Sequence, residues 1–451
     1  MTNIIIGLIM IASFLGLVYY CIKGYNLMVG FFVVTTGWVI LTLIGNAISP
    51  VSSMEGKTVL DVLTTVYQGG PQAYAQSILV NIFFGAFFGR VLMDTGIAGT
   101  LIRKTVELGG DRPGVTMVLL CIVTSLCFTS LNGIGPVISI AVIVMPILLA
   151  LGIPSPLALF AFMGSVMAGV LLNVSAFAQY SGVLGGIDPR FTEEYTYQDY
   201  FTFGVVAMVI VLVVVIAVSL ISLSRGRKSH AWAASTAGAE VKDAPWFSWI
   251  SVILPVGLIV VFKCPIILAF IVSALYALTT CGKFAQGFTK SCTMLARQFA
   301  DGAVDVAPMV GFLLIMSMFN KAATFAAPYF QSVIGGIFPT TPLLLCALFA
   351  VLFPLGFFHG PTTLTGCGTA TAAVVIAIAP WSVTFLYPLF SVTTIIPQHM
   401  DLTQSWVAWG LGYTKVASKD FLKYSIPTVW ISGILCCAAV YLMYGSVAFA
   451  A

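Results

Sequence analysis

Two clusters of small polar residues interrupt long apolar stretches of the sequence. The first is SLNGIGP at 130–136, and the second is HGPTTLTG at 359–366. Hydroxyl and amide groups, and backbone N–H groups at the start of a half-helix, could together bind an anion such as a carboxylate. The residues that we predict to contact it are Ser130, Asn132, Gly133, Gly135, Gly360, Thr362, Thr363 and Thr365.

A polar interruption also follows each cluster, in the next apolar run of the chain. Asn173 and Ser175, followed by Gln179, form it in the first half, and Thr393 and Thr394, followed by Gln398, form it in the second. We predict that Asn173, Ser175, Thr393 and Thr394 complete the substrate site from the opposite wall. The alternative is that they only join helices through hydrogen bonds.

Histidine and aspartate residues near these clusters are candidates for proton coupling. His359 lies deep in an apolar stretch, where an ionisable side chain is costly, and a role in proton exchange would explain its presence. The alternative is a neutral histidine that locks the break through hydrogen bonds to the backbone. His399 and Asp401 could titrate as a pair or cap their helix. His230 lies in a polar segment and is expected to be exposed to solvent.

Charged residues at a spacing of four predict ion pairs along helices. Arg90 and Asp94 share one helical face and are expected to pair with each other. Arg297, Asp301 and Asp305 share a face in the second half, and Asp305 is the member that we expect to reach a proton path.

The composition of the chain indicates that these residues lie in a membrane protein. The chain has 451 residues, of which 60% are hydrophobic and 8% are charged, whereas about 25% are charged in soluble proteins. A soluble globule is excluded, and we predict an all-α polytopic membrane protein with about ten crossings. The apolar runs are 3–22, 27–48, 77–95, 155–180, 201–224, 247–262, 266–281, 304–320, 383–400 and 426–447.

Two further apolar stretches, 114–152 and 342–380, contain the polar clusters and are each a re-entrant hairpin or a pair of crossings. Either way the chain returns to the side that it left. With the N-terminus outside, fourteen basic residues fall in cytoplasmic connections and four fall outside. The positive-inside rule therefore predicts that both termini lie outside, and the short connections favour a bacterial inner membrane.

The chain also divides into two similar halves. Residues 72–152 run from a polar approach through a charged apolar helix to a broken hairpin, and residues 300–380 repeat that order in the opposite orientation. Inverted repeats are typical of secondary transporters. We predict an N-terminal membrane repeat at 1–224, a cytoplasmic linker at 225–245 and a C-terminal membrane repeat at 246–451.

Several function classes lack their signatures in this sequence. There is no GxxxxGK[ST], HExxH or GxSxG motif and no basic tract with interleaved aromatics, and the ten cysteines form no CxxC pair. We therefore expect no enzyme activity, no cofactor, no metal site and no nucleic-acid partner. The energy for transport must come from an ion gradient or from the substrate gradient.

Four segments resemble the ion transporter superfamily, most nearly the gluconate permease family and the related citrate symporters. They are NIFFGAFFGRVLMDTG and its continuation to 110, LNGIGPVISIAVIVMP and its continuation to 169, GPTTLTGCGTATAAVV at 360–375, and QHMDLTQSWVAWGLGYTK and its continuation to 427. The resemblance implies a two-repeat fold with paired re-entrant hairpins, uptake of small organic anions coupled to protons or sodium, and a possible homodimer. It carries the hairpin-tip role onto Ser130, Asn132, Gly133, Gly360, Thr362 and Thr363.

The sequence thus predicts a carrier that imports a small carboxylate or sugar acid by proton symport. A sodium-coupled symporter or a cation/proton antiporter of the same superfamily is the alternative. A channel would need a continuous polar stripe, and a membrane-embedded enzyme would need a nucleophile or a metal cluster, and neither is visible in the sequence.

Overall fold

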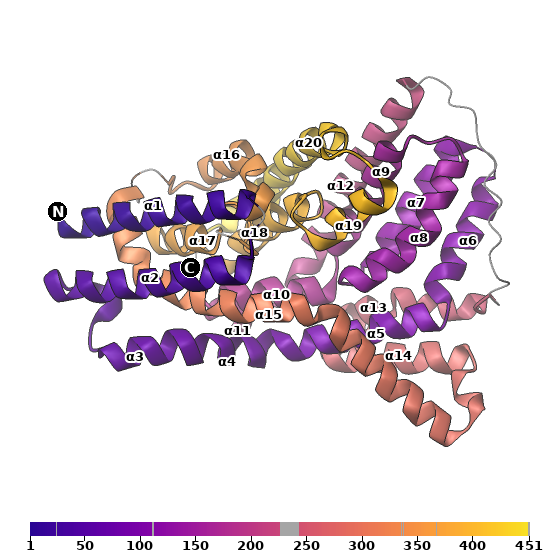
Figure 1. Ribbon diagram of the computed structural model, residues 1–451, viewed down its shortest axis with the longest axis horizontal. Coiled ribbons are helices and arrows are strands. Elements are labelled where there is room, and N and C mark those ends of the chain that lie inside the picture. The colour runs from indigo at the N-terminus through magenta and orange to yellow at the C-terminus, as the bar shows by residue number, and fades with distance from the viewer. Residues whose placement is uncertain are drawn as a thin grey trace.

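The computed structural model describes residues 1–23, 25–110, 112–225, 243–334, 336, 338–366 and 368–449. Within these ranges the regular structure is helical, apart from one isolated bridge between Trp381 and Phe449 (Figure 1). The prediction of an all-α fold is confirmed. His230 and most of the predicted linker at 225–245 lie outside the described residues.

The α-helices are α1 (Thr2–Ile22), α2 (Leu27–Ile48), α3 (Val59–Thr64), α4 (Gly70–Tyr74), α5 (Val80–Asp94), α6 (Ile97–Gly109), α7 (Pro113–Phe128), α8 (Ile134–Ala150), α9 (Ser155–Val170), α10 (Val174–Gly185), α11 (Arg190–Glu193), α12 (Tyr197–Arg225), α13 (Leu254–Phe262), α14 (Ile266–Thr280), α15 (Phe288–Ile334), α16 (Pro342–Leu352), α17 (Gly368–Ile378), α18 (Val383–Gln398), α19 (Ser405–Thr414) and α20 (Ser418–Tyr444). Short 3₁₀ segments at Ser52–Met54, Trp246–Val252, Lys283–Gln286, Phe353–His359 and Gly445–Val447 complete the helical structure, together with π-turns at Thr65–Gly69 and Ala75–Leu79.

Five of the helical segments are long and apolar enough to cross a membrane by themselves. They lie at Met28–Ile48, Tyr197–Ser224, Val310–Val333, Pro342–His359 and Ser418–Val447. Two bent pairs, α5 with α6 at 53° and α9 with α10 at 66°, raise the number to seven. The chain is therefore a multi-pass membrane protein, in which some of the expected continuous crossings are divided into shorter helices.

The two predicted hairpins are present. α7 and α8 are 16 and 17 residues long and join at the first polar cluster, while α16, a 3₁₀ segment and α17 surround the second. At a rise of 1.5 Å per residue, α7 and α8 are each about 25 Å long, which is less than the hydrocarbon thickness of about 30 Å. This length suits a hairpin whose tip stops inside the membrane.

One long helical segment was not predicted in full. The apolar run at 77–95 is only the end of a segment that begins at Val59 and continues through α3, α4 and α5 across the two π-turns. Gly70 and Pro71 lie at the start of α4. Proline has no backbone N–H group and cannot donate the regular helical hydrogen bond. The first π-turn lies directly before α4, and its change of helical register accommodates the ring of Pro71.

α15 is the central helix of the molecule and packs along α1, α2, α5 and α17 (Figure 1). It crosses α5 closely, because a Cβ atom at Gly302 would lie 2.9 Å from the backbone of Ala86. The connections between α6 and α7 and between α14 and α15, which carry predicted cytoplasmic basic residues, lie at the same end of the molecule, on the right in Figure 1. Shared placement of these connections is what the predicted orientation requires.

Candidate functional site

The second broken helix is held in an unusual backbone conformation. Phe358 and His359 are consecutive non-glycine residues with φ of 58° and 55°, in the left-handed region that such residues rarely adopt. The His359 ring nitrogen Nδ1 lies 3.0 Å from the Thr365 carbonyl oxygen, and the Thr363 hydroxyl donates to the Gly356 carbonyl at 2.7 Å. Such strain persists only where the surroundings enforce it, and it is concentrated at functional sites.

Two glycines allow the chain to fold back on itself at this tip. A Cβ atom at Gly366 would lie 2.2 Å from the His359 carbonyl oxygen, and one at Gly368 would lie 2.6 Å from the Thr363 amide nitrogen. Both neighbours are backbone atoms, which cannot move aside as a side chain could. The close approach of the two backbone segments of the tip therefore requires glycine at both positions.

The chain between α18 and α19 braces the second tip. Asp401 accepts hydrogen bonds from the His359 N–H at 3.3 Å and from the Thr403 N–H and hydroxyl at 2.9 and 2.8 Å. In α18, the Thr394 hydroxyl oxygen accepts from the Leu364 N–H at 2.9 Å. Asp401 is only 1% exposed and forms no ion pair with any residue that the structure describes.

A cavity of about 190 Å³ opens beside this tip, which is room for about six water molecules. It is lined by Gln179, Phe312, Leu313, His359, Thr365, Gln398, Thr403, Gln404, Ser405 and Trp406. The His359 nitrogen Nε2 and the Thr365 hydroxyl are buried without a hydrogen-bond partner in the described part of the chain. We refer to this space as the central cavity.

Of the predicted site residues, His359 and Thr365 line the central cavity, while Gly360, Thr362 and Thr363 build the tip around it. Among the supporting residues, Thr393 and Thr394 are hydrogen-bonded to Phe390 and to the tip, respectively. His399 bonds the Ile395 carbonyl and stacks on Trp406 with ring centres 5.3 Å apart. No bond joins His399 to Asp401 in the described part, so the two do not form the pair that the sequence suggested.

At the first broken helix, the polar groups instead form hydrogen bonds with other groups of the protein. The Ser130 hydroxyl donates to the Val252 carbonyl, and Asn132 accepts from the Gly133 N–H at 2.8 Å. Asn173, in the break between α9 and α10, donates to the Phe128 and Leu131 carbonyls, both at 2.9 Å. These hydrogen bonds leave Ser130 and Asn173 positioning the first tip, and neither residue lines the central cavity. Ser175 is buried, and its hydroxyl has no hydrogen-bond partner within the described ranges.

An ion pair fills the place where an anion was expected at the first tip. Arg90 contacts both carboxylate oxygens of Asp305 at 2.6 and 2.7 Å. A Cβ atom at Gly135, in the first turn of α8, would lie 2.6 Å from Asp305. The predicted Arg90–Asp94 pair is therefore wrong, because Arg90 reaches across to α15, while Asp94 accepts from Gln298 at 3.2 Å.

Both tips contact the same helix. Gly133 and Gly135 face Val306 and Asp305 of α15, and the ring of His359 lies 6.3 Å from that of Phe312 on the same helix. Six or seven residues of helix separate these contacts, which corresponds to about 10 Å. The two tips therefore lie along one helix, and of the two only the second contributes residues to the lining of the central cavity.

Breaking the Arg90–Asp305 pair should destabilise the protein. We expect Arg90→Met to lower the free energy of unfolding by about 1–3 kcal/mol, less than for a fully buried pair because the Arg90 side chain is 30% exposed. The double variant Arg90→Met/Asp305→Leu should recover most of this loss. Thermal unfolding of purified protein in detergent measures both effects.

The matched control is Arg297→Met, since Arg297 is 81% exposed in its pair with Asp301 and its loss should cost under about 0.5 kcal/mol. If Arg90→Met unfolds at the same temperature as the wild type, the pair does not stabilise the contact between α5 and α15.

Sequence reasoning missed part of the cavity wall. Gln404, Ser405 and Trp406 follow the last predicted polar interruption, and no spacing rule marks them. Phe312 and Leu313 belong to an apolar run and have no chemical signal of their own. Gln179 and Gln398 were visible as polar residues within apolar helices, which is the signal that identifies them.

Among known proteins, the similarity of this chain is to solved structures. No family model matches the chain, and no curated protein sequence matches it. The crystal structure of the YdaH transporter of Alcanivorax borkumensis, described as having an unusual topology, matches 96% of this chain and 98% of its own with a TM-score of 0.63 and 13% sequence identity. The chain therefore has the fold of that transporter, and this likeness does not extend to the gluconate permease family specifically.

Proposed function

We propose that this protein is a secondary transporter that imports a small organic anion, a carboxylate or sugar acid, by proton symport with alternating access. The observation that carries the proposal is the central cavity, which lies between helices of the bundle at a broken helix and beside the buried Asp401. Irregular backbone at membrane depth is tolerated where it faces protein or a watered cavity, and such a cavity is a place for substrate.

The side chains around the central cavity suit an anion. The amide groups of Gln179 and Gln398 and the hydroxyl of Thr365 can donate hydrogen bonds to a carboxylate, and Gln398 also accepts one from the Tyr180 hydroxyl at 2.8 Å. No lysine or arginine is among its lining residues. Recognition would therefore rest on neutral donors and on His359.

Electrostatics explains why substrate binding would require a proton. An anion in this cavity lies near the Asp401 carboxylate in a medium of low dielectric constant, where like charges repel strongly. A proton on Asp401 or on His359 removes that repulsion or reverses it. Substrate and proton would then bind together, which is the condition for symport.

Sodium is the second candidate for the coupling ion. The hydroxyl oxygens of Thr362 and Thr365 are buried at the tip without hydrogen-bond partners in the described residues, and Asp401 supplies a carboxylate nearby in the same assembly. Oxygen atoms are the ligands that hard cations prefer. The sodium-coupled symporter therefore remains the alternative, together with a cation/proton antiporter.

The proposal is tested by uptake of a panel of labelled small carboxylates into proteoliposomes, with pH and sodium gradients imposed independently. We expect a pH gradient alone to drive accumulation, and His359→Ala to abolish accumulation while exchange continues. If a sodium gradient alone drives uptake, the coupling ion is sodium. If no carboxylate moves under either gradient, the substrate class is wrong.

The placement of the chain in the cell belongs to the same proposal. We propose a bacterial inner membrane, with both termini outside and with the halves at 1–224 and 246–451 moving relative to each other. The resemblance found in the sequence implies a homodimer as a further expectation.

A further inference from the structure

Three cavities each have part of their lining on α10. An outer cavity of about 440 Å³ is formed by α10, by the connection after it and by the connection between α13 and α14. A middle cavity of about 10 Å³ shares Gly182 with the outer cavity and Leu313 with the central cavity. The middle cavity therefore borders both larger cavities, and the outer cavity is the one lined by connections that the sequence predicts to lie outside.

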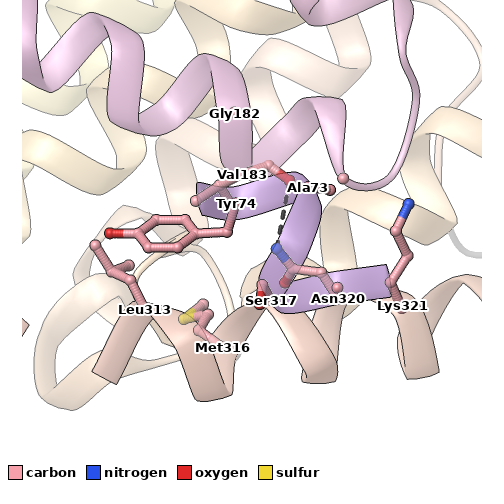
Figure 2. A pocket seen from close by; sticks show the side chains of 11 residues that line it. Ala73, Tyr74, Gly182, Val183, Leu313, Met316, Ser317, Asn320 and Lys321 are labelled. Atoms are coloured by element: carbon pink, nitrogen blue, oxygen red, sulfur yellow. Dashed lines mark hydrogen bonds between the residues drawn. The ribbon is translucent and has the colours of Figure 1, made fainter. Parts of the chain in front are cut away.

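The middle cavity is the narrow point of this series. It lies where α4, α10 and α15 meet (Figure 2), and its volume is at the lower limit for holding a single water molecule. α4 is in direct contact with α15, because a Cβ atom at Gly70 would lie 2.7 Å from the Ser317 carbonyl oxygen. A π-turn lies on each side of α4. In this conformation the larger cavities are separated from each other.

Polar groups without partners face the middle cavity. The Tyr74 hydroxyl and the Asn320 oxygen Oδ1 are buried and lack hydrogen bonds within the described residues, while the Asn320 amide nitrogen donates to Val183 at 3.3 Å. Buried polar groups are usually satisfied, and exceptions in a native structure call for an explanation. A polar ligand that passes through this space would supply the missing partner.

Lys321 is the cation of the middle cavity. It is half-buried, lies within the membrane-length segment Val310–Val333 of α15 and forms no ion pair in the ranges that the structure describes. Eight residues of α15 separate it from Leu313, or about 12 Å, and Figure 2 shows the two at opposite ends of the cavity. The predicted apolar run 304–320 ends directly before it, so Lys321 lies at the predicted outer end of this crossing, where a half-buried lysine without an ion pair marks a candidate ion or substrate path.

We propose that the middle cavity is the closed outer gate of the transport path, and that Lys321 pairs with the carboxylate of the substrate as it passes from the outer to the central cavity. This inference rests on the proposed function. An anion that leaves water needs a countercharge, and the flexible lysine side chain can follow it over several ångströms. The Tyr74 hydroxyl, at the Leu313 end, can donate the next hydrogen bond.

The test compares Lys321→Gln, Lys321→Arg and wild type in proteoliposomes and in detergent. Removal of the charge should lower the initial rate of uptake by at least about tenfold, equivalent to about 1.4 kcal/mol in the barrier. Substrate affinity in detergent, measured by ligand-induced thermal stabilisation, should change by less than about twofold. Lys321→Arg should retain about a third or more of the rate, because it retains the charge.

Lys419→Gln is the matched control, because Lys419 is exposed, lies in the first turn of α20 and is outside the three cavities. It should transport at the wild-type rate. Normal uptake by Lys321→Gln would refute the proposal that the middle cavity is a gate, but it would not affect the proposal that the protein is a carrier. An equal loss of substrate affinity and of uptake rate would show that Lys321 belongs to the binding site, and it would also refute the proposal that the middle cavity is a gate. A wild type that moves no carboxylate would overturn both proposals.

Discussion

Asp401→Asn is expected to abolish ion-driven accumulation of substrate while counterflow exchange continues. For symport of one proton, a gradient of about one pH unit stores about 1.4 kcal/mol and supports about a tenfold substrate ratio across the membrane. The variant should reach a ratio of about one. The reason is that asparagine resembles the protonated carboxyl group, so that the anion can bind without a coupling ion.

The asparagine variant should fold. Its side-chain oxygen can still accept from the His359 or Thr403 N–H groups that hold Asp401. A neutral residue already braces the first tip, since the Asn173 amide, in the break between α9 and α10, donates to the Phe128 and Leu131 carbonyls. A brace of this kind therefore does not require a charge.

Accumulation ratios in proteoliposomes, measured with pH and sodium gradients separately, check this prediction. The control is Asp301→Asn, whose carboxylate is 41% exposed in its pair with Arg297 and should leave the ratio unchanged. Accumulation by Asp401→Asn at the wild-type ratio would show that Asp401 is not the coupling residue.

Gly366→Ala is expected to stop transport, both driven and exchange. The added Cβ atom would lie 2.2 Å from the His359 carbonyl oxygen and 2.5 Å from its carbonyl carbon. The tip must then open, which moves His359 away from Thr365 and Asp401. A displacement of about 1 Å at a site of chemistry or binding costs about a hundredfold in rate, and we expect a loss at least that large.

Gly412→Ala provides the comparison, because nothing lies within 4 Å of its added Cβ atom on α19. Alanine also has the higher helix propensity, so this variant should be as stable as the wild type or more stable. Initial rates of exchange and the temperature of thermal unfolding distinguish the two variants. If Gly366→Ala exchanges substrate at half the wild-type rate or more, the strained second tip is not part of the transport site.

The breaks in the helices could be predicted because their signal is local. Glycine, proline and small polar residues inside an apolar stretch interrupt a helix wherever they occur, and both hairpins lie where 130–136 and 359–366 placed them. The helix from Val59 to Tyr74 escaped prediction for the same reason. Its glycines and proline indicate a break, but two π-turns and packing on α15 keep the segment helical.

The partners of the charged residues could not be predicted from spacing. Arg90 and Asp305 are 215 residues apart, and only the crossing of α5 and α15 brings them together. Asp401 and His359 are 42 residues apart and meet through the folded tip. A spacing rule compares residues within one helix, so it paired Arg90 with Asp94.

Counterflow distinguishes a carrier for a small carboxylate from a channel or an inactive protein. Proteoliposomes are loaded with one unlabelled carboxylate of the panel and diluted into trace labelled substrate, without any ion gradient. We predict a transient accumulation of label above equilibrium for at least one carboxylate, and none in protein-free vesicles. If the label only equilibrates, or does not enter for any member of the panel, the protein is not a carrier for these carboxylates.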